Sequence, residues 1–287
     1  MIAQYPQFSD ISLGFRNALH PLFKGLPEGI SEFTFAGIYL FRDVHNYKIA
    51  LAENTYVISG SDKGEPFFIC PFELPQKNLL NELFDKFRTF KAVTESQKKH
   101  LEQYHYMVFE DRDNFDYLYS RSEFTDLSGR KFHKKRNLFL NFVKHQQWEG
   151  KPLLDEYVPH ALEVLEQWKA VQQIEADYLS AKEALEKMEL LQLCGGIYYV
   201  REKPVAWCLG EELALGKSFV LHFAKAVRPD RYKGIYQFLN QNFASILPEK
   251  YEYINLEQDL GDTGLRQSKA SYNPVGFVKK YKAVKKV

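Results

Sequence analysis

The chain has 287 residues, a length typical of one large or two medium domains. Hydrophobic residues make up 45% and charged residues 26%, which is ordinary for a globular protein and excludes global disorder and fibrous repeats. The net charge of +1 excludes a uniformly basic coat protein for nucleic acid. Seven Lys or Arg and no Asp or Glu lie between residues 263 and 287, so the remainder of the chain carries a net charge of −6.

The three cysteines give no signal of a disulfide or a metal site. Cys70, Cys194 and Cys208 lie singly in apolar surroundings and form no CxxC pair, so we expect reduced thiols. The N-terminus lacks the basic and apolar regions of a signal peptide, and no apolar run approaches the roughly 18–20 residues that span a bilayer. These features predict a cytoplasmic protein with no membrane span and no metal site.

The first part of the chain predicts a helix, an antiparallel meander of three strands, and then alternating helices and strands. Hydrophobic residues recur at helical spacing in the predicted helices, and turn-forming residues separate the strands of the meander. The predicted elements are a helix over 31–44, strands over 47–51, 55–60 and 66–70, a helix over 77–90, a strand over 90–93, a helix over 94–103 and a strand over 104–109. The polar residues 110–114 mark a junction.

The second part repeats this order with more helices before its meander. The predicted elements are a strand over 116–120, helices within 131–145, 155–171 and 176–193, strands over 196–201, 205–213 and 218–226, a helix over 234–247, a strand over 251–256, a helix over 262–270 and a strand over 276–284. This order is typical of N-acetyltransferase (GNAT-type) domains of the α/β (α+β) class. We therefore expect two tandem domains with mixed, mostly antiparallel sheets: a degenerate, structural one over 1–113 and a second over 114–287.

The densest charged segment begins the first helix of the second part. Its cations are Arg130, Lys131, Lys134, Lys135 and Arg136. On a helical wheel Lys135 falls within the apolar arc, and a cation against a packed face is costly unless it is paired or faces an anion. We therefore favour a concave site for a phosphate-rich ligand over an ordinary solvated face, unless the helix starts only at residue 137 and the segment is a basic loop.

A second basic segment, RPDRYKGIY over 228–236, joins a predicted strand to a predicted helix. Gly234 at such a turn lets the backbone approach a ligand, and the free N–H groups of a helix start bind phosphate. Arg231 and Lys233 add positive charge. An ordinary surface loop explains these residues equally well.

A polar cluster follows the strand predicted over 251–256. Glu257 and Asp259 could accept a proton from an amine, or they could simply pair with Arg266 and Lys269. Tyr272 could act as a general acid, although a packed tyrosine explains it too, and Asp262 is best explained as a helix cap.

Four stretches of the chain, taken together, resemble a known bacterial family. They are DYLYS (116–120), LSGRKFHKKRN (127–137), HFAKAVRPDRYKGIYQFLNQNFA (222–244) and INLEQDLGDTGLRQSKASYNPVG (254–276). The family comprises uncharacterised tandem acetyltransferase-fold proteins. It is related to the C-terminal domain of phosphatidylglycerol lysyltransferase and, more distantly, to the Fem-type peptidoglycan aminoacyltransferases. The resemblance covers most of the chain and is strongest from Asp116 onward.

The resemblance also bears on the donor. In acetyltransferases of this fold, a loop of the type Arg/Gln-x-x-Gly-x-Gly/Ala holds the pyrophosphate of acetyl-CoA. Arg231 and Gly234 match that loop, but Tyr236 stands where a small residue is expected. The bulky ring and the basic segment together favour aminoacyl-tRNA over acyl-CoA.

The resemblance thus implies transfer of an aminoacyl group from aminoacyl-tRNA to an amine or hydroxyl of a small molecule or peptide. The expected catalytic residues are Glu257, Asp259, Lys269 and Tyr272. The expected donor-binding residues are Arg130, Lys131, Lys134, Lys135, Arg136, Arg231, Lys233, Gly234 and Arg266. Two alternatives stay open: a CoA-dependent N-acyltransferase, and a non-catalytic protein that binds RNA or an anionic metabolite on the same fold.

Overall fold

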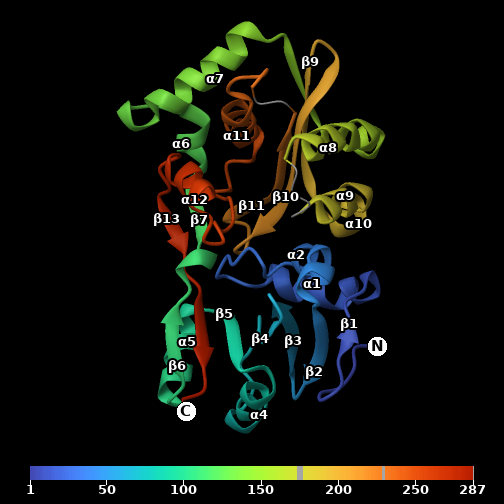
Figure 1. Ribbon diagram of the computed structural model, residues 1–287, viewed down its shortest axis with the longest axis vertical. Coiled ribbons are helices and arrows are strands. Elements are labelled where there is room, and N and C mark those ends of the chain that lie inside the picture. The colour runs from blue at the N-terminus through green and yellow to red at the C-terminus, as the bar shows by residue number, and fades with distance from the viewer. Residues whose placement is uncertain (173–176, 228–229, 287) are drawn as a thin grey trace.

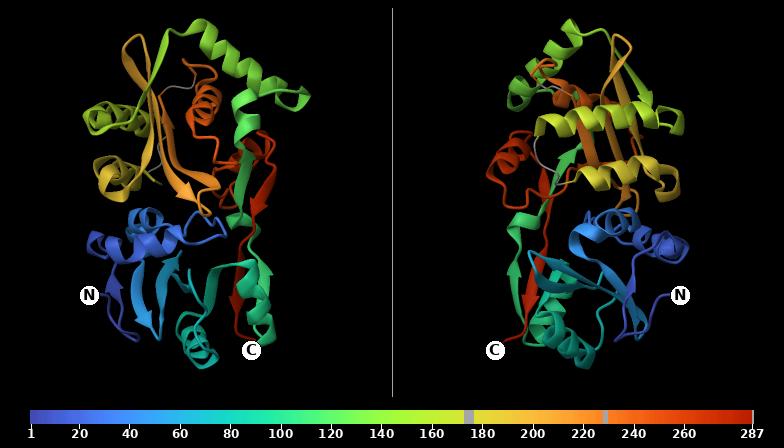
Figure 2. Two further views of the ribbon diagram at one scale, coloured as in Figure 1. Left: turned by 180° about the vertical axis from the view of Figure 1, so that it is seen from behind. Right: turned by 45° about the vertical axis from the view of Figure 1, so that its right-hand side comes forward.

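The computed structural model describes residues 1–172, 177–227 and 230–286, which form two lobes stacked along the long axis of the molecule (Figures 1 and 2). We call the part built on the first sheet, with helices α1 to α5, the first lobe. The part built on the second sheet, with helices α6 to α12, is the second lobe. Each sheet has seven strands.

The first sheet has the strand order β1-β2-β3-β4-β5-β14-β6. Its neighbours are antiparallel except for β4 and β5, which are parallel. The strands are β1 (Ser9–Asp10), β2 (Lys48–Ala52), β3 (Thr55–Asp62), β4 (Glu65–Ile69), β5 (Thr89–Val93), β6 (Met107–Glu110) and β14 (Tyr281–Val284), and the helices are α1 (Arg16–Lys24), α2 (Phe35–Leu40), α3 (Arg42–His45), α4 (Lys77–Phe87) and α5 (Glu95–Gln103). The meander predicted from the sequence is therefore present.

Local sequence explains where the helices of the first lobe begin. Thr94 caps α5 with a full capping box, because its side chain accepts from the Gln97 N–H while the Gln97 side chain accepts from the Thr94 N–H. The helix predicted over 31–44 is shorter and broken, since Thr34 rather than Ser31 caps α2 by accepting from the Gly37 N–H at 2.8 Å. Helix α1 was not among the predicted elements.

The second sheet has the strand order β13-β7-β12-β11-β10-β9-β8, with β11 and β12 parallel. Helices α8 to α10 lie on one face of this sheet and α11 on the other (Figure 2). The strands are β7 (Asp116–Ser120), β8 (Trp148–Pro152), β9 (Cys194–Val200), β10 (Lys203–Leu213), β11 (Ser218–Ala226), β12 (Tyr253–Asn255) and β13 (Gly276–Val278), and the helices are α6 (Arg121–Asp126), α7 (His133–His145), α8 (Val158–Gln172), α9 (Tyr178–Glu186), α10 (Met188–Leu191), α11 (Ile235–Ile246) and α12 (Thr263–Ala270). The first residue of the helix predicted over 176–193 lies outside the described residues.

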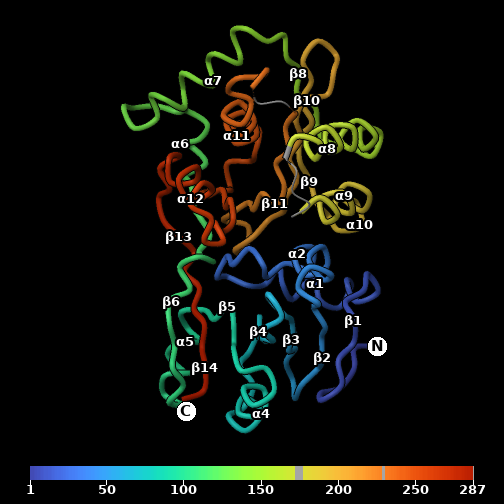
Figure 3. Tube along the Cα trace, in the orientation of Figure 1, coloured from blue at the N-terminus to red at the C-terminus, as the bar shows by residue number. Residues whose placement is uncertain are grey.

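The C-terminal strand differs from its prediction in a way that changes the domain organisation. The single strand predicted over 276–284 is two strands, and they belong to different sheets. Strand β13 pairs with β7 in the second sheet, whereas β14 crosses back and fills the first sheet between β5 and β6 (Figure 3). A division of the chain at residue 113 does not anticipate this exchange.

A buried ionic cluster lies where the chain crosses between the lobes. Lys280, fully buried between β13 and β14, donates to Asp116 at 2.7 Å and also pairs with Glu32. Asp116 accepts further hydrogen bonds from the Ser31 N–H and hydroxyl, both at 2.8 Å. Burial raises the pKa of Asp116 to about 6, whereas the Lys280 ammonium outweighs burial at Glu32 and lowers its pKa.

The apolar core also continues from one lobe into the other. Phe41 of the first lobe stacks on Phe223 of β11 with ring centroids 6.0 Å apart, and Trp207 of β10 is completely buried beside Phe223. This continuity and the ionic cluster hold the two lobes as one body. The predicted fold class, two GNAT-like domains with mixed sheets, is confirmed.

The tail that looks basic in the sequence is neutralised in the fold. Lys279 pairs with Glu110, Lys282 with Asp111 and Lys285 with Asp85. Most of the positive charge between residues 263 and 287 thus pairs with acids of the same chain. Within the ranges described above, no helix is both long enough and apolar enough to cross a membrane.

Candidate functional site

Strands β11 and β12 run parallel for three residues and then part. Their last paired residues are Val220 and Asn255, while β11 continues to Ala226. His222 sits just beyond this point, in the register shift where β11 is irregular against β10. A bulge changes the direction in which the side chains of a strand point. The irregularity at this position therefore directs the His222 side chain toward the end of β12.

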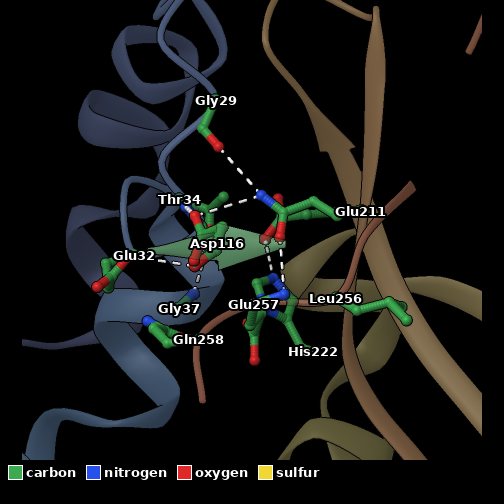
Figure 4. Close-up of polar contacts among 12 residues, drawn as sticks. Gly29, Glu32, Thr34, Gly37, Asp116, Glu211, His222, Leu256, Glu257 and Gln258 are labelled. Carbon is green, nitrogen blue, oxygen red and sulfur yellow. Dashed lines mark hydrogen bonds and ion pairs between the residues drawn. The ribbon is translucent and has the colours of Figure 1, made fainter. Parts of the chain in front are cut away.

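His222 lies between two carboxylates at this opening. Its Nδ1 is 2.7 Å from Glu257 Oε1, and its Nε2 is 3.1 Å from Glu211 Oε1 (Figure 4). Burial alone would lower the pKa of His222, but its hydrogen bonds to Glu211 and Glu257 raise that pKa to about 10. At neutral pH the ring is therefore an imidazolium, which donates from both nitrogens.

Glu257 is the member of this group that faces outward. Its side chain is 21% exposed, compared with 6% for Glu211 and 1% for His222. His222 engages Oε1, and the Asn255 side chain accepts from the Glu257 backbone N–H at 2.7 Å, so the residue is fixed at two points. Among the described residues Oε2 of Glu257 has no hydrogen-bond partner, which leaves it available to a ligand or a proton.

Lys269 supports the turn that carries Glu257. Its ammonium donates to the carbonyl oxygens of Leu256 and Gln258, on both sides of Glu257. Burial lowers the pKa of Lys269 to about 8, although the negative charge of Glu257 acts to raise it. Lys269 thus lies beside Glu257 as predicted, but its hydrogen bonds hold the backbone and give it a positioning role.

The prediction that Asp259 accepts a proton is contradicted by its contacts. Arg266 donates to both of its oxygens, at 2.9 and 2.7 Å, and Tyr117 donates to Oδ2 at 2.7 Å. Although burial opposes ionisation, these bonds hold the pKa of Asp259 far below its usual range. Arg266 also pairs with Asp113 at 2.7 Å, so it is engaged by carboxylates and is not free for a donor phosphate.

The basic segment forms an open groove with the end of α12. This basic groove has a volume of about 670 Å³, and its polar lining includes Arg130, Lys131, Lys134, Lys135, Ser271 and Asn273. The Asn273 side chain donates to the Lys131 carbonyl at 3.1 Å and so ties the two walls together. The first helical turn is 3₁₀ over Arg130–Phe132, and α7 follows directly.

The cations of the segment divide into three kinds. Arg130 and Lys134 are exposed, and Lys131 is exposed but pairs with Glu123 at 2.6 Å. Lys135 is half-buried over the Tyr272 ring, 3.7 Å from its centroid, and burial lowers its pKa. Arg136 turns away from the groove and donates to the carbonyls of Leu127 and Gly129, which contradicts a donor-binding role for it.

Tyr272 belongs to this groove more than to the polar turn. Its hydroxyl accepts from the Gln237 amide at 2.8 Å, and burial raises its pKa. A phenol with a raised pKa is a poor proton donor, so the structure speaks against Tyr272 as a general acid. Its ring instead supports the Lys135 ammonium.

Helix α12 connects the two parts of the site. Lys269, which anchors the Glu257 turn, and Ser271 and Asn273, which line the basic groove, all lie within five residues at its C-terminal end. Asp262 caps the other end of this helix by accepting from the Leu265 N–H at 2.6 Å, as predicted. The candidate site is therefore the Glu257 turn together with the basic groove, and Figure 1 labels the helices α7 and α12 that carry parts of it.

The second basic segment is not built as a ligand loop. Gly234 has φ of +92°, and a Cβ on it would lie 2.0 Å from the Leu138 carbonyl oxygen. Gly234 is therefore needed so that the start of α11 can pack against α7, which contradicts the expectation that its backbone approaches a phosphate. Arg231 and Lys233 are exposed beside it, and residues 228 and 229 of this segment lie outside the described residues.

Sequence reasoning missed Glu211, His222 and Lys225. Lys225 on β11 is buried over the Trp168 ring, 3.8 Å from its centroid, and pairs with Asp177 at 2.5 Å. A buried polar residue inside an otherwise apolar strand was the available signal for all three, because such residues need partners. The partners themselves depend on the register of β10, β11 and β12, which the sequence does not display.

Comparison with known proteins agrees with this architecture. A conserved protein of unknown function from Bacteroides thetaiotaomicron VPI-5482 is 28% identical, with a TM-score of 0.87 and complete coverage of both chains. L-PGS from Bacillus licheniformis is 14% identical, with a TM-score of 0.64 over 96% of this chain and 93% of that one. FemX is 8% identical, with a TM-score of 0.59 over 96% of each chain. The last two show a shared fold.

No functionally curated protein sequence matches the chain. A family described as "Phosphatidylglycerol lysyltransferase, C-terminal" matches residues 23–284, which is nearly the whole length. The chain belongs to this family and is an aminoacyl- or acyltransferase-like protein of tandem acetyltransferase fold.

Proposed function

We propose that the protein transfers an aminoacyl group from aminoacyl-tRNA to an amine or hydroxyl acceptor. The observation that carries the proposal is the Glu257 carboxylate, which is fixed by His222 and still has one free oxygen at the opening between β11 and β12. The basic groove lies at the same end of α12 and offers Arg130, Lys134 and Lys135 to a phosphate-bearing donor. The family's printed description, a lysyltransferase, supports the aminoacyl class.

The reaction needs little beyond positioning and one proton acceptor. The acceptor nucleophile attacks the ester carbonyl carbon, its bond to that carbon forms, and the bond from the carbon to the tRNA ribose oxygen breaks. Glu257 takes the proton from the nucleophile and returns it to the departing ribose oxygen, which becomes a hydroxyl. The ester is already activated, so holding the two reactants together supplies much of the acceleration.

The structure gives less support to a CoA-dependent transferase. Acetyl-CoA in acetyltransferases of this fold would place its pyrophosphate at the start of α11, where Gly234 packs against the Leu138 carbonyl. The half-buried Tyr236 ring stands in the first turn of the same helix. These contacts argue against a pyrophosphate at the start of α11.

A transfer assay with both donors tests the proposal. The protein is incubated with tRNA charged with a mixture of radiolabelled amino acids, or with radiolabelled acetyl-CoA. The acceptor panel contains free amines, short peptides and phosphatidylglycerol vesicles. We expect label to leave tRNA for one class of acceptor and none to leave acetyl-CoA.

The matched variant is Glu257→Gln, which keeps the shape of the side chain and removes its basicity. We expect it to slow transfer by roughly 10²–10⁴-fold, the usual contribution of a general base. Equal rates for the variant and the wild type would overturn the role of Glu257. Binding of tRNA with no transfer to any acceptor would instead favour a non-catalytic RNA-binding protein.

A further inference from the structure

The segment over 127–147 is strongly basic. It contains six permanent cations, and the nearest acids in sequence are Asp126 and Glu149 at its two ends. Its cations are Arg130, Lys131, Lys134, Lys135, Arg136 and Lys144. Because the chain as a whole has a net charge of only +1, this segment is a local basic surface on a molecule that is otherwise acidic.

Two of these cations, Lys134 and Lys144, lie on one face that runs the length of α7, while Arg130, Lys131 and Lys135 line the basic groove at its start. We call that face the α7 outer face; it comprises the exposed residues His133, Lys134, Asn137, Leu140, Lys144 and His145 and the half-buried Asn141. Lys134 and Lys144 have no carboxylate partner among the described residues, unlike the paired lysines of the C-terminal tail. The α7 outer face therefore keeps its positive potential for a partner.

The helix is held as a rigid ridge by its opposite face. Phe139 and Phe142 stack on Phe238 of α11, with ring centroids 6.4 and 4.5 Å apart, and Gly234 packs directly on the Leu138 carbonyl. Helix α7 crosses the far end of the second lobe with its outer face directed away from α11 (Figures 1 and 2). Its 13 residues extend for about 20 Å.

The ridge begins at the candidate site. Lys134 and Lys135 line the basic groove, whereas Lys144 and His145 lie at the distal end of α7, about 15 Å further along the helix. A polyanion that follows the ridge would thus lead one of its ends to the groove. A small anionic metabolite bound in the groove would not reach the charges at the distal end of α7.

The side chains on this face favour RNA over a membrane surface. Leu140, 37% exposed, is the one large apolar side chain that the described structure shows on the α7 outer face, too little for insertion between lipids. The remaining side chains are lysines, histidines and asparagines, which donate hydrogen bonds to phosphate and to ribose hydroxyls. A-form duplexes are recognised mainly through such backbone and 2′-hydroxyl contacts across the wide, shallow minor groove.

We infer that the α7 outer face docks duplex RNA, so that the stem of the donor lies along α7 and its end reaches the basic groove. This inference rests on the proposed function for its choice of donor, but the surface and its charge are independent of the chemistry at Glu257. Recognition through phosphates predicts binding that is insensitive to sequence and weakens steeply with salt.

The test uses the full chain and a fluorescently labelled RNA hairpin with a 12-base-pair stem, over a range of salt concentrations. The variant is Lys144→Gln, because Lys144 lies outside the basic groove. We expect about fivefold weaker binding at low salt and a slope of log K against log salt that is smaller by about 1. The matched control is Lys99→Gln, an exposed helical lysine of α5 that also lacks a carboxylate partner, and it should leave both quantities unchanged.

Equal effects of Lys144→Gln and Lys99→Gln would overturn the inference. A second result would also overturn it: vesicles of phosphatidylglycerol and phosphatidylcholine bind the wild type but not Lys144→Gln, and they displace the hairpin from the wild type. The α7 outer face would then be a lipid-binding surface. If Lys144→Gln transfers from aminoacyl-tRNA at the wild-type rate at all donor concentrations, the docking surface is wrong and the proposed function is retained. If hairpin binding depends on Lys144 but no acceptor receives an aminoacyl group, the docking surface is retained and the proposed function is wrong.

Discussion

Burial and the neighbouring carboxylates act on the pKa of His222 in opposite directions, and the effect of the carboxylates is larger. A buried imidazole is normally neutral, but two glutamates at 2.7 and 3.1 Å raise its pKa to about 10. The imidazolium in turn fixes the rotamer of Glu257 and leaves one carboxylate oxygen free. His222 is accordingly a positioning residue, and Glu257 is the group that would contact a substrate.

The pH dependence of stability should reveal this charge. The folded protein keeps a proton on His222 that the unfolded chain loses near pH 6.5, so His222 stabilises fully below that pH and loses its contribution as pH rises toward 10. In this window the free energy of unfolding should fall with a slope that approaches about 1.4 kcal/mol per pH unit from this residue. Urea unfolding of the wild type and of His222→Gln should differ by that slope.

Should the variant fail to fold, NMR of the wild-type histidine rings gives the same answer. One imidazole, that of His222, should remain protonated at pH 8.5. If no imidazole is protonated at that pH, the Glu211–His222–Glu257 arrangement is not as described.

Glu257 and Asp259, which the sequence analysis gave the same role, should differ in how their mutation affects activity and stability. Glu257→Gln should lose transfer with a modest loss of stability, because its side chain is 21% exposed and Glu211 still pairs with the buried His222. Asp259→Asn should lose more unfolding free energy, since it takes the charge from a completely buried carboxylate that is held by Tyr117 and by Arg266, whose own side chain is 38% exposed. Denaturant unfolding and single-turnover transfer measured on both variants check this, and the opposite pattern would reverse the two roles.

At the scale of elements, α7 packs against the start of α11. The start of α11 is where a phosphate would be expected from the sequence, and α7 occupies that place through the Leu138 carbonyl. The basic groove at the start of α7 remains open. The candidate anion site is therefore this groove and not the start of α11.

Gly234→Ala tests this packing. The new Cβ would lie 2.0 Å from the Leu138 carbonyl oxygen at φ of +92°, so we expect a loss of about 3 kcal/mol of stability from steric overlap and backbone strain. Gly64→Ala, in the turn between β3 and β4, is the matched control, since Gly64 has φ of +84° with nothing within 4 Å of its Cβ position, and it should lose only about 1 kcal/mol. Equal losses would mean that α7 does not press on the start of α11.

The elements were largely predictable, because their signals are local. The apolar spacing of Leu79, Leu80, Leu83 and Phe84 is that of α4, and Thr94 with Gln97 is a capping box readable from the sequence. The site was predictable only in part. Glu257 and Lys269 stand close in sequence, whereas the pairing of His222 with Glu211 and the saturation of Asp259 by Arg266 depend on strand register and on long-range contacts.

At the scale of the whole molecule, the C-terminal segment and one ionic cluster join the two lobes. Strand β14 completes the first sheet, and Lys280 just before it pairs with Glu32 of the first lobe and Asp116 of the second. Both sides of the crossing therefore depend on the last residues of the chain. This arrangement was not visible in the sequence, which shows only a basic tail on an acidic body.

Lys280→Met should destabilise both lobes together. Removal of the cation leaves the buried Asp116 carboxylate unpaired next to the partly exposed Glu32 carboxylate, which costs about 3 kcal/mol. Lys279→Met is the control on the neighbouring residue, whose ammonium is exposed and pairs with Glu110, and little change is expected. Calorimetry should show a single transition at lower temperature for Lys280→Met, whereas loss of one lobe alone would contradict the shared cluster.

The most direct test of the account is a single-turnover transfer experiment with radiolabelled aminoacyl-tRNA, comparing wild type with Glu257→Gln at saturating protein. The account predicts that the wild type moves label from tRNA to an amine or hydroxyl acceptor, and that the variant binds the same tRNA with unchanged affinity but transfers at least 100-fold more slowly. Label that moves from acetyl-CoA but never from tRNA, or equal rates for the two proteins, would contradict it.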